Sequence, residues 1–194
     1  NRKVHAWFEP LVQGFIRVPF NDIEAIHNAA ENSAEICAIL VEPIQGEGGV
    51  NIPDDDYLQQ IRQICDQNDW LMMLDEVQTG IARTGKMFAF QHTDVTPDVM
   101  TLAKGLGNGV PVGACLTQGK ANGLFQPGNH GSTFGGNFLS SRVALTVLDI
   151  VEREKLAERS IHLGKLISDE ISKHSEISGM IDHVRHMGLM IGIQ

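Results

Sequence analysis

Two short apolar runs that end abruptly at a charged residue constrain this chain more than any other feature. Residues 70–74 are followed by Asp75, and residues 99–103 are followed by Lys104. A continuous apolar run of this length is typical of a strand buried on both faces in a parallel sheet covered by helices. Ligands of such sheets bind outside the carboxyl ends of the strands. We therefore expect an acid, Asp75, and a buried amine, Lys104, to meet at one rim of a sheet.

A third apolar run strengthens this interpretation. Residues 36–41 also stop at an acid, Glu42, and residues 112–116 form a further strand candidate. Between the first two runs, residues 55–69 carry one apolar stripe at helical spacing. The alternation of strands and helices predicts an α/β fold with a largely parallel sheet covered by helices. Three strands ending in ionisable residues then place three such residues at one crevice.

Helical patterns cover much of the remaining chain. Asn21 and Glu24 form a predicted capping box that opens a helix through about residue 32. Residues 139–174 have helical periodicity, with a break near Glu154. The apolar side chains expected to pack inward from this long segment are Val143, Leu145, Val147, Leu148, Val151, Leu156, Ile161, Leu163, Leu166, Ile167 and Ile171.

Both ends of the chain suggest a portion of a longer protein. The first residue is not methionine, and the last residues, 188–194, are an apolar run. Residues 184–192 have the pattern of the first strand of a second domain. We therefore expect a fragment that ends just inside a second domain.

Composition argues against several classes of function. The formal net charge of -9 disfavours a non-specific nucleic-acid binder or a membrane-surface protein. No apolar stretch reaches the roughly 18–20 residues of a membrane span. The cysteines, Cys37, Cys65 and Cys115, form no paired motif and are expected to be reduced, buried thiols of a cytoplasmic protein. His183 and His186 have no further ligand cluster, so no metal site is predicted.

The expected meeting of Lys104 and Asp75 has a chemical and a structural interpretation. Desolvation favours the uncharged lysine amine, which can then attack a carbonyl to form a Schiff base. A buried carboxylate requires a partner, and a pyridinium nitrogen is one. Pyridoxal phosphate needs both groups, a lysine for its aldehyde and a carboxylate for its ring nitrogen. The alternative is an Asp–Lys ion pair at the rim of the sheet.

A glycine-rich stretch precedes the long helical segment. Residues 127–137 combine glycines with the hydroxyls of Ser132 and Thr133. Backbone amides and the helix dipole make such a segment a candidate anion site. The alternative is an ordinary capped helix start.

With these residues in view, the chain resembles the ornithine-type pyridoxal-phosphate-dependent aminotransferases from about Phe8 to its end. The motifs that carry the resemblance are VEPIQGEGG at 41–49, DEVQTG at 75–80, RTG at 83–85, AKGL at 103–106 and HGSTFGGN at 130–137. The resemblance implies the large domain of a fold type I pyridoxal-phosphate transferase, truncated at both ends, because family members are about twice as long. It implies a large cofactor-binding domain over 1–153 that is incomplete on its N-terminal side. Residues 154–194 would then form a connecting helix and the first strand of a truncated C-terminal small domain.

The resemblance also implies roles for individual residues at the cofactor. Lys104 matches the lysine that forms the Schiff base and moves protons, and Asp75 matches the partner of the pyridine nitrogen. Val77 matches the apolar residue packed on one face of the ring. Gln78 matches the hydrogen-bond partner of the phenolic oxygen. Thr133 matches the phosphate ligand that the second subunit of a homodimer supplies.

The substrate side is implied in the same way. Ser132 lies near the substrate in the family, and Glu47 matches a glutamate that pairs with a substrate-binding arginine. Glu42 matches a structural or substrate-gating acid. Within the family, the resemblance is to members that move the amino group of N-acetylornithine to 2-oxoglutarate in arginine biosynthesis. Ornithine, succinylornithine, 4-aminobutyrate and putrescine stay open as amine donors, and so does a catalytically silent folded scaffold.

Overall fold

The computed structural model describes residues 5–174 and 179–194 and divides the chain into two compact units, Asn1–Ile36 and Cys37–Gln194. The first unit contains helix α2 (Ile23–Asn32). Its N-cap is Asp22, whose Oδ1 accepts a hydrogen bond from the backbone amide of Ala25 at 2.9 Å. The predicted capping box of Asn21 and Glu24 is therefore wrong, because the helix begins one residue later than the pattern indicated.

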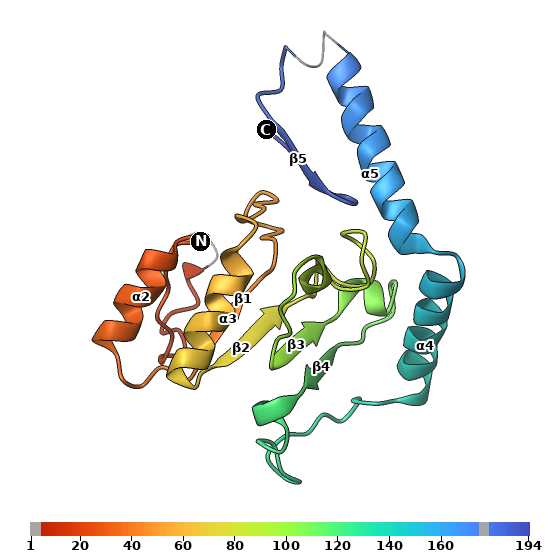
Figure 1. Cartoon of the computed structure of the whole chain (residues 1–194). Coiled ribbons are helices and arrows are strands. Elements are labelled where there is room, and N and C mark those ends of the chain that lie inside the picture. The colour runs from red at the N-terminus through yellow and green to blue at the C-terminus, as the bar shows by residue number, and fades with distance from the viewer. Residues whose placement is uncertain (1–4, 175–178) are drawn as a thin grey trace. The chain divides into compact units, whose positions relative to one another are not determined.

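The second unit is built on a four-stranded mixed sheet with the order β1-β2-β3-β4 (Figure 1). Strands β1 (Ala38–Val41), β2 (Leu71–Asp75) and β3 (Val99–Leu102) are parallel, and β4 (Ala114–Thr117) pairs antiparallel with β3. The predicted, largely parallel sheet is confirmed. Because parallel strands end at the same edge, Asp75 at the end of β2 lies on one rim with Glu42 and Lys104, which follow β1 and β3.

Helix α3 (Tyr57–Asn68) covers one face of this sheet. Its predicted apolar stripe is buried, and the sheet residues Met72 and Leu74 are fully buried as well. Burying an apolar side chain of this size contributes about 1.5–3 kcal/mol. The stripe consists of Tyr57, Leu58, Ile61, Ile64 and Cys65.

Burial of the strands on both faces is wrong at the two edges of the described sheet. Leu40 in β1 is 57% exposed and Leu116 in β4 is 44% exposed. An apolar run indicates that a strand can be buried, but it does not specify how much of each face is covered by other elements. The prediction of buried cysteines is confirmed for Cys65 in α3 and wrong for Cys37 and Cys115, which are exposed free thiols.

The long helical segment is two helices, α4 (Phe138–Arg153) and α5 (Leu156–Lys173), and the predicted break near Glu154 is confirmed. Helix α4 reaches the core around Met100 and Leu102 through Ala144 and Leu148. Val151 is buried as predicted. The prediction of inward packing is wrong for four side chains that are 39–55% exposed, namely Leu145, Ile161, Leu166 and Ile167. The apolar stripe of these helices is wider than the surface that packs against the rest of the protein.

The C-terminal residues form a hairpin of β5 (Val184–Met187) and β6 (Met190–Ile193), where a single strand was expected. The chain turns at Gly188, whose φ of +55° favours glycine. A Cβ on Gly164 of α5 would lie 1.9 Å from the carbonyl oxygen of Gly188. The two glycines therefore let the hairpin turn pack directly on α5.

Three short 3-10 helices complete the second unit: η1 (Ala89–His92), η2 (Lys104–Leu106) and η3 (Gly119–Ala121). The first lies between β2 and β3. No helix within residues 5–174 and 179–194 has the length and apolar character needed to span a bilayer.

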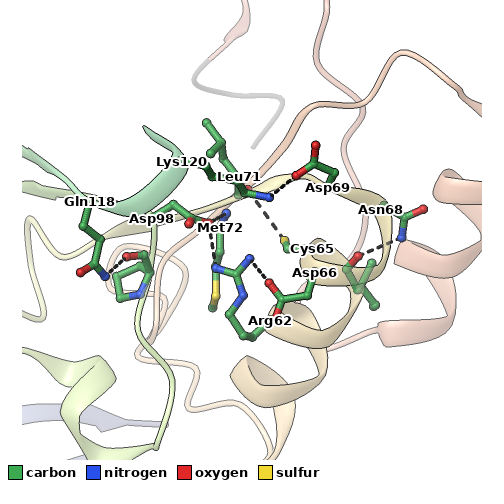
Figure 2. A network of polar contacts seen from close by, with 12 residues as sticks. Arg62, Cys65, Asp66, Asn68, Asp69, Leu71, Met72, Asp98, Gln118 and Lys120 are labelled. Atoms are coloured by element: carbon green, nitrogen blue, oxygen red, sulfur yellow. Dashed lines mark hydrogen bonds and ion pairs between the residues drawn. The ribbon is translucent and has the colours of Figure 1, made fainter. Parts of the chain in front are cut away.

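A polar network joins α3 to the amino ends of β2 and β3, at the edge opposite Asp75 (Figure 2). Arg62 pairs with Asp98 at 2.7 Å and with Asp66 at 2.7 Å. The same oxygen of Asp98 accepts the backbone amide of Met72 at 2.8 Å. These contacts hold α3 against the sheet, at the edge opposite the one where β1, β2 and β3 end.

We predict that Asp98 gives the fold a measurable acid sensitivity. Burial alone would raise the pKa of Asp98, but the Met72 amide and Arg62 outweigh it and lower that pKa. The lowered folded pKa means that this stabilisation is present above the unfolded pKa and is lost as pH falls through the folded value. Asp98→Asn should cost roughly 2–3 kcal/mol in urea unfolding at pH 7, and this cost should shrink at pH 3.

The control is Asp66→Asn, which removes a carboxylate that also pairs with Arg62 but is 65% exposed. Exposed pairs contribute about 0–1 kcal/mol, so this variant should stay close to the parent. An Asp98→Asn penalty that is the same at pH 7 and pH 3 would contradict the prediction.

Candidate active site

A pocket of about 410 Å³ lies at the rim where β2 and β3 end. Four segments line it: the loop after β1, the turn after β2, the start of η2 and the C-terminal hairpin. The pocket thus combines residues that are far apart in the sequence, as the strand-end pattern predicts for the first three segments. The lining residues come from 46–50, 77–83, 104–105 and 189–191.

Lys104 lines this pocket, but its side chain is exposed and not buried as predicted. Strand β3 ends at Leu102, and Lys104 adopts a φ of +41° at the start of η2. The strand thus ends two residues before the lysine, which lies in a turn and not in the sheet. Among the described residues Lys104 makes no ion pair, so the alternative of an Asp75–Lys104 pair is wrong.

Asp75 is the last residue of β2 and is half-buried. Its Oδ1 accepts the backbone amide of Val77 at 3.0 Å and the hydroxyl of Thr101 at 3.4 Å. These bonds hold the carboxylate at the strand end, next to the residues of the turn that line the pocket. Val77, also half-buried, presents an apolar side chain there.

Gln78 and the loop after β1 are in direct contact. A Cβ on Gly46 would lie 1.2 Å from Oε1 of Gln78, so glycine alone leaves room for that side chain. Nε2 of Gln78 also lies 3.5 Å from Oε1 of Glu47, at the outer limit of a hydrogen bond. Glu42 supports the loop from behind, because its Oε2 accepts the backbone amide of Gly46 at 3.0 Å.

Ser132 and Thr133 do not line this pocket. Both are exposed on the loop before α4. Asn137 caps that helix, since its Oδ1 accepts the backbone amide of Ser140 at 3.0 Å. The capped helix start is thus confirmed, while the anion site at this loop stays a prediction.

The hairpin wall of the pocket was not foreseen from the sequence. The amide of Leu189 donates to the carbonyl of Arg83 at 2.9 Å. Arg185 donates to the carbonyls of Gly49 at 3.0 Å and Val50 at 3.3 Å. The spacing of Gly188 and Gly192 was the available signal, since both sit where a Cβ would meet neighbouring backbone.

Two charged residues also escaped the sequence argument. Arg83 belongs to the RTG motif at 83–85, for which no function was predicted, and it lines the pocket. Glu76, next to Asp75, is 1% exposed and points away from the pocket lining. Within residues 5–174 and 179–194, no group of three or more histidine, cysteine or acidic side chains is placed to hold a metal ion.

Comparison with known proteins adds a family and several relatives. A family model described as "Aminotransferase class-III" matches residues 1–194. The chain is 57% identical over 194 residues to an acetylornithine aminotransferase of Nitrosomonas europaea, covering 100% of this chain and 49% of that protein. It is 46% identical over 189 residues to an ornithine aminotransferase of Staphylococcus carnosus, covering 96% of this chain and 46% of that protein.

Solved structures agree with these relatives. The ornithine aminotransferase of Toxoplasma gondii superposes with a TM-score of 0.94 at 36% identity, covering 100% of this chain and 46% of that one. The acetylornithine aminotransferase of Elizabethkingia anophelis gives 0.88 at 47% identity, covering 95% and 46%. The fold class expected from the sequence is confirmed. The chain spans about half the length of the relatives it matches.

Proposed function

This chain belongs to the class-III aminotransferase family, and from that membership we propose that it is the cofactor-binding part of a pyridoxal-phosphate-dependent aminotransferase. The proposed reaction moves the amino group of N-acetylornithine to 2-oxoglutarate, as in arginine biosynthesis. The observation that carries the proposal is one pocket that joins the amine of Lys104 to the turn that follows Asp75. The 57% identity to an acetylornithine aminotransferase favours this amine donor.

The residues present fit pyridoxal phosphate by their chemistry. Lys104 offers a primary amine without an ion-pair partner among the described residues, and Val77 offers an apolar surface. Asp75 offers a carboxylate held at the strand end by Val77 and Thr101. When bound, the cofactor supplies a reactive aldehyde and a ring that accepts electrons.

Each residue then has a defined task. Lys104 would hold the cofactor through its Nζ and later carry the proton that moves at the substrate carbon. Asp75 would keep a proton on the ring nitrogen. Val77 would pack on one ring face, and Gln78 would donate a hydrogen bond to the phenolic oxygen from its place against Gly46.

We extend the proposal to a homodimer whose sites are shared between subunits. Thr133 is exposed and lies outside its own pocket, which supports a role as phosphate ligand in the partner's site, with Ser132 near the substrate. Glu47 would pair with a substrate-binding arginine, and Glu42 would keep the loop in place through Gly46. The large-domain boundary at residue 153 and the cytoplasmic location belong to this proposal too.

Ornithine is the second candidate amine donor. Specific support comes from the ornithine aminotransferase of Staphylococcus carnosus at 46% identity and that of Toxoplasma gondii at a TM-score of 0.94. The donors differ by the acetyl group on the α-amine, so one carries a cationic α-ammonium where the other carries a neutral amide.

The test is a comparison of kcat/KM for N-acetylornithine and ornithine in the intact holoenzyme, with 2-oxoglutarate as the acceptor. We expect N-acetylornithine to be preferred by at least about tenfold, because a site built for a neutral amide leaves a cation unpaired. A preference for ornithine would replace the first donor by the second. Absence of turnover with either donor would contradict the proposed reaction.

We predict that Gly46→Ala weakens cofactor binding through Gln78. The new methyl group would occupy the position of Oε1 of Gln78, which lies 1.2 Å from the ideal Cβ. The side chain of Gln78 must therefore rotate away, and losing a neutral hydrogen bond should lower pyridoxal-phosphate affinity about 3- to 10-fold. Spectrophotometric titration of the intact apoprotein measures this affinity.

Gly48→Ala is the matched control in the same loop. Its nearest neighbour would be the flexible end of Gln45 at 3.1 Å, so a small adjustment accommodates the methyl group. Equal affinities of the two variants would show that displacement of Gln78 is not what binding depends on.

A further inference from the structure

We propose that Glu76 is a positioning residue of the site, whose buried carboxylate fixes the turn that presents Asp75, Val77 and Gln78 to the cofactor. This inference rests on the proposed function and assigns a task to a residue that does not line the pocket. It concerns how the site keeps its geometry.

The side chain of Glu76 is one of the most completely enclosed polar groups in the described structure, at 1% exposure. Its Oε2 accepts the hydroxyl of Thr79 at 2.5 Å and the backbone amide of Ala89 at 2.9 Å. Its Oε1 accepts the backbone amide of Phe90 at 2.9 Å. The carboxylate therefore ties the turn after β2 to the start of η1.

The backbone of Glu76 is held as firmly as its side chain. Its amide donates to the carbonyl of Thr101 in β3 at 3.0 Å, and its carbonyl accepts the amide of Gly80 at 2.9 Å. The first bond extends the β2–β3 pairing by one residue, and the second closes the turn. Between these points lie Val77 and Gln78, which both line the pocket.

A carboxylate suits this position better than an amide. All three groups that face it are donors, and a carboxylate has acceptor oxygens only. In Glu76→Gln, the new NH₂ group would face one of those donors, and that bond would be lost. Burial raises the pKa of Glu76 and the three hydrogen bonds oppose the shift, so the site retains the acid at a cost in desolvation.

The consequence for the reaction follows from geometry. The amide of Val77 donates to Oδ1 of Asp75 at 3.0 Å, so a shift of the turn moves the carboxylate proposed to hold the ring proton. Displacements of about 1 Å in supporting residues cost up to 100-fold in rate. Glu76 acts through its neighbours, and its loss should alter turnover more than substrate binding.

The experiment compares Glu76→Gln with Asp98→Asn in the intact holoenzyme. Asp98 is a matched control, because it is a partly buried carboxylate with backbone and side-chain donors at the opposite edge of the sheet (Figure 2). Both are measured where urea unfolding shows them folded. The readouts are kcat and KM, and the pH midpoint of the visible band of bound pyridoxal phosphate without substrate.

We expect Glu76→Gln to lower kcat about 10- to 100-fold with KM within about threefold, and to shift the spectral midpoint. Asp98→Asn should change neither. If Glu76→Gln behaves like Asp98→Asn, the inference is overturned and Glu76 is a structural residue only. A parent protein without the visible band would instead overturn the proposed function, and this inference with it.

A second pair of variants decides the matter if Glu76→Gln does not fold. Thr79→Val removes the hydroxyl that donates to Glu76 at 2.5 Å, whereas Thr79→Ser keeps a hydroxyl. Support is a spectral shift and a lower kcat in Thr79→Val that are restored in Thr79→Ser. Parental values in Thr79→Val would overturn the inference.

Discussion

Replacing Lys104 by alanine in the intact enzyme is expected to lower transamination by at least about 10⁴-fold. The amine is the proposed attachment point of the cofactor and the proposed carrier of the proton that moves at the substrate carbon. The attachment cannot pass to Asp75 or Arg83, because a carboxylate and a guanidinium do not form the required bond to an aldehyde. Activity with N-acetylornithine and 2-oxoglutarate at saturating pyridoxal phosphate is the measurement.

The fold should survive this substitution. Lys104 is exposed and makes no ion pair within the described residues, and such surface changes usually alter stability by about 0.5 kcal/mol or less. The matched control is Lys120→Ala. Lys120 pairs with the exposed Asp69 at 3.0 Å, near the amino end of β2 (Figure 2). Because this pair lies away from the pocket, Lys120→Ala should leave turnover at the parental level.

Borohydride reduction followed by peptide mapping gives an independent check, since it records which lysine carries the cofactor. We expect the label on Lys104. A label on Lys86 or Lys120, or turnover by Lys104→Ala close to that of the parent, would remove Lys104 from the role proposed for it.

Much of the rim could be predicted because the pattern that encodes it is local. An apolar run followed by a charged residue specifies a strand and its end together, and parallel pairing then brings several ends to one edge. Residues 36–41 and 70–74 gave β1 and β2 within two residues. The stripe of α3 likewise followed from helical spacing, and all five of its members are buried.

What the sequence did not determine depends on contacts between distant segments. Lys104 is exposed and has a φ of +41°, and no neighbouring residue type predicts either property. The hairpin forms a pocket wall because Gly188 and Gly192 allow close backbone approach and Arg185 reaches the carbonyls of Gly49 and Val50. Periodicity reports which side chains are apolar, and it is silent on which loop will meet which hairpin.

The hydrogen-bond partners of Glu76 in η1 could not be predicted from the sequence for the same reason. In the sequence, Glu76 is one more acid beside Asp75, and its amide donors lie 13 and 14 residues further along the chain. Two neighbouring carboxylates can take different roles when their surroundings differ. Asp75 is half-buried and Glu76 is 1% exposed, and this difference is visible only in the folded structure.

Asp75→Asn is expected to reduce turnover more strongly than cofactor affinity. A charge-assisted hydrogen bond to a pyridinium nitrogen contributes about 1.5–3 kcal/mol, which corresponds to roughly a 10- to 100-fold loss of affinity. Turnover should fall further, because a ring that loses its proton also loses much of its capacity to accept electrons. Turnover at saturating pyridoxal phosphate, beside a spectrophotometric titration of affinity, separates the two effects.

The substitution is well suited to this separation because it preserves the local fold. Oδ1 of Asp75 accepts from the Val77 amide at 3.0 Å and the Thr101 hydroxyl at 3.4 Å, and the amide oxygen of the variant can accept both. The change is therefore the loss of one charge and the replacement of the second carboxylate oxygen by an NH₂ group, at nearly unchanged shape. Asp66→Asn, at a carboxylate that is 65% exposed in an ion pair with Arg62, serves as the control. Turnover of Asp75→Asn within a factor of about two of that control would show that the ring proton does not depend on this carboxylate.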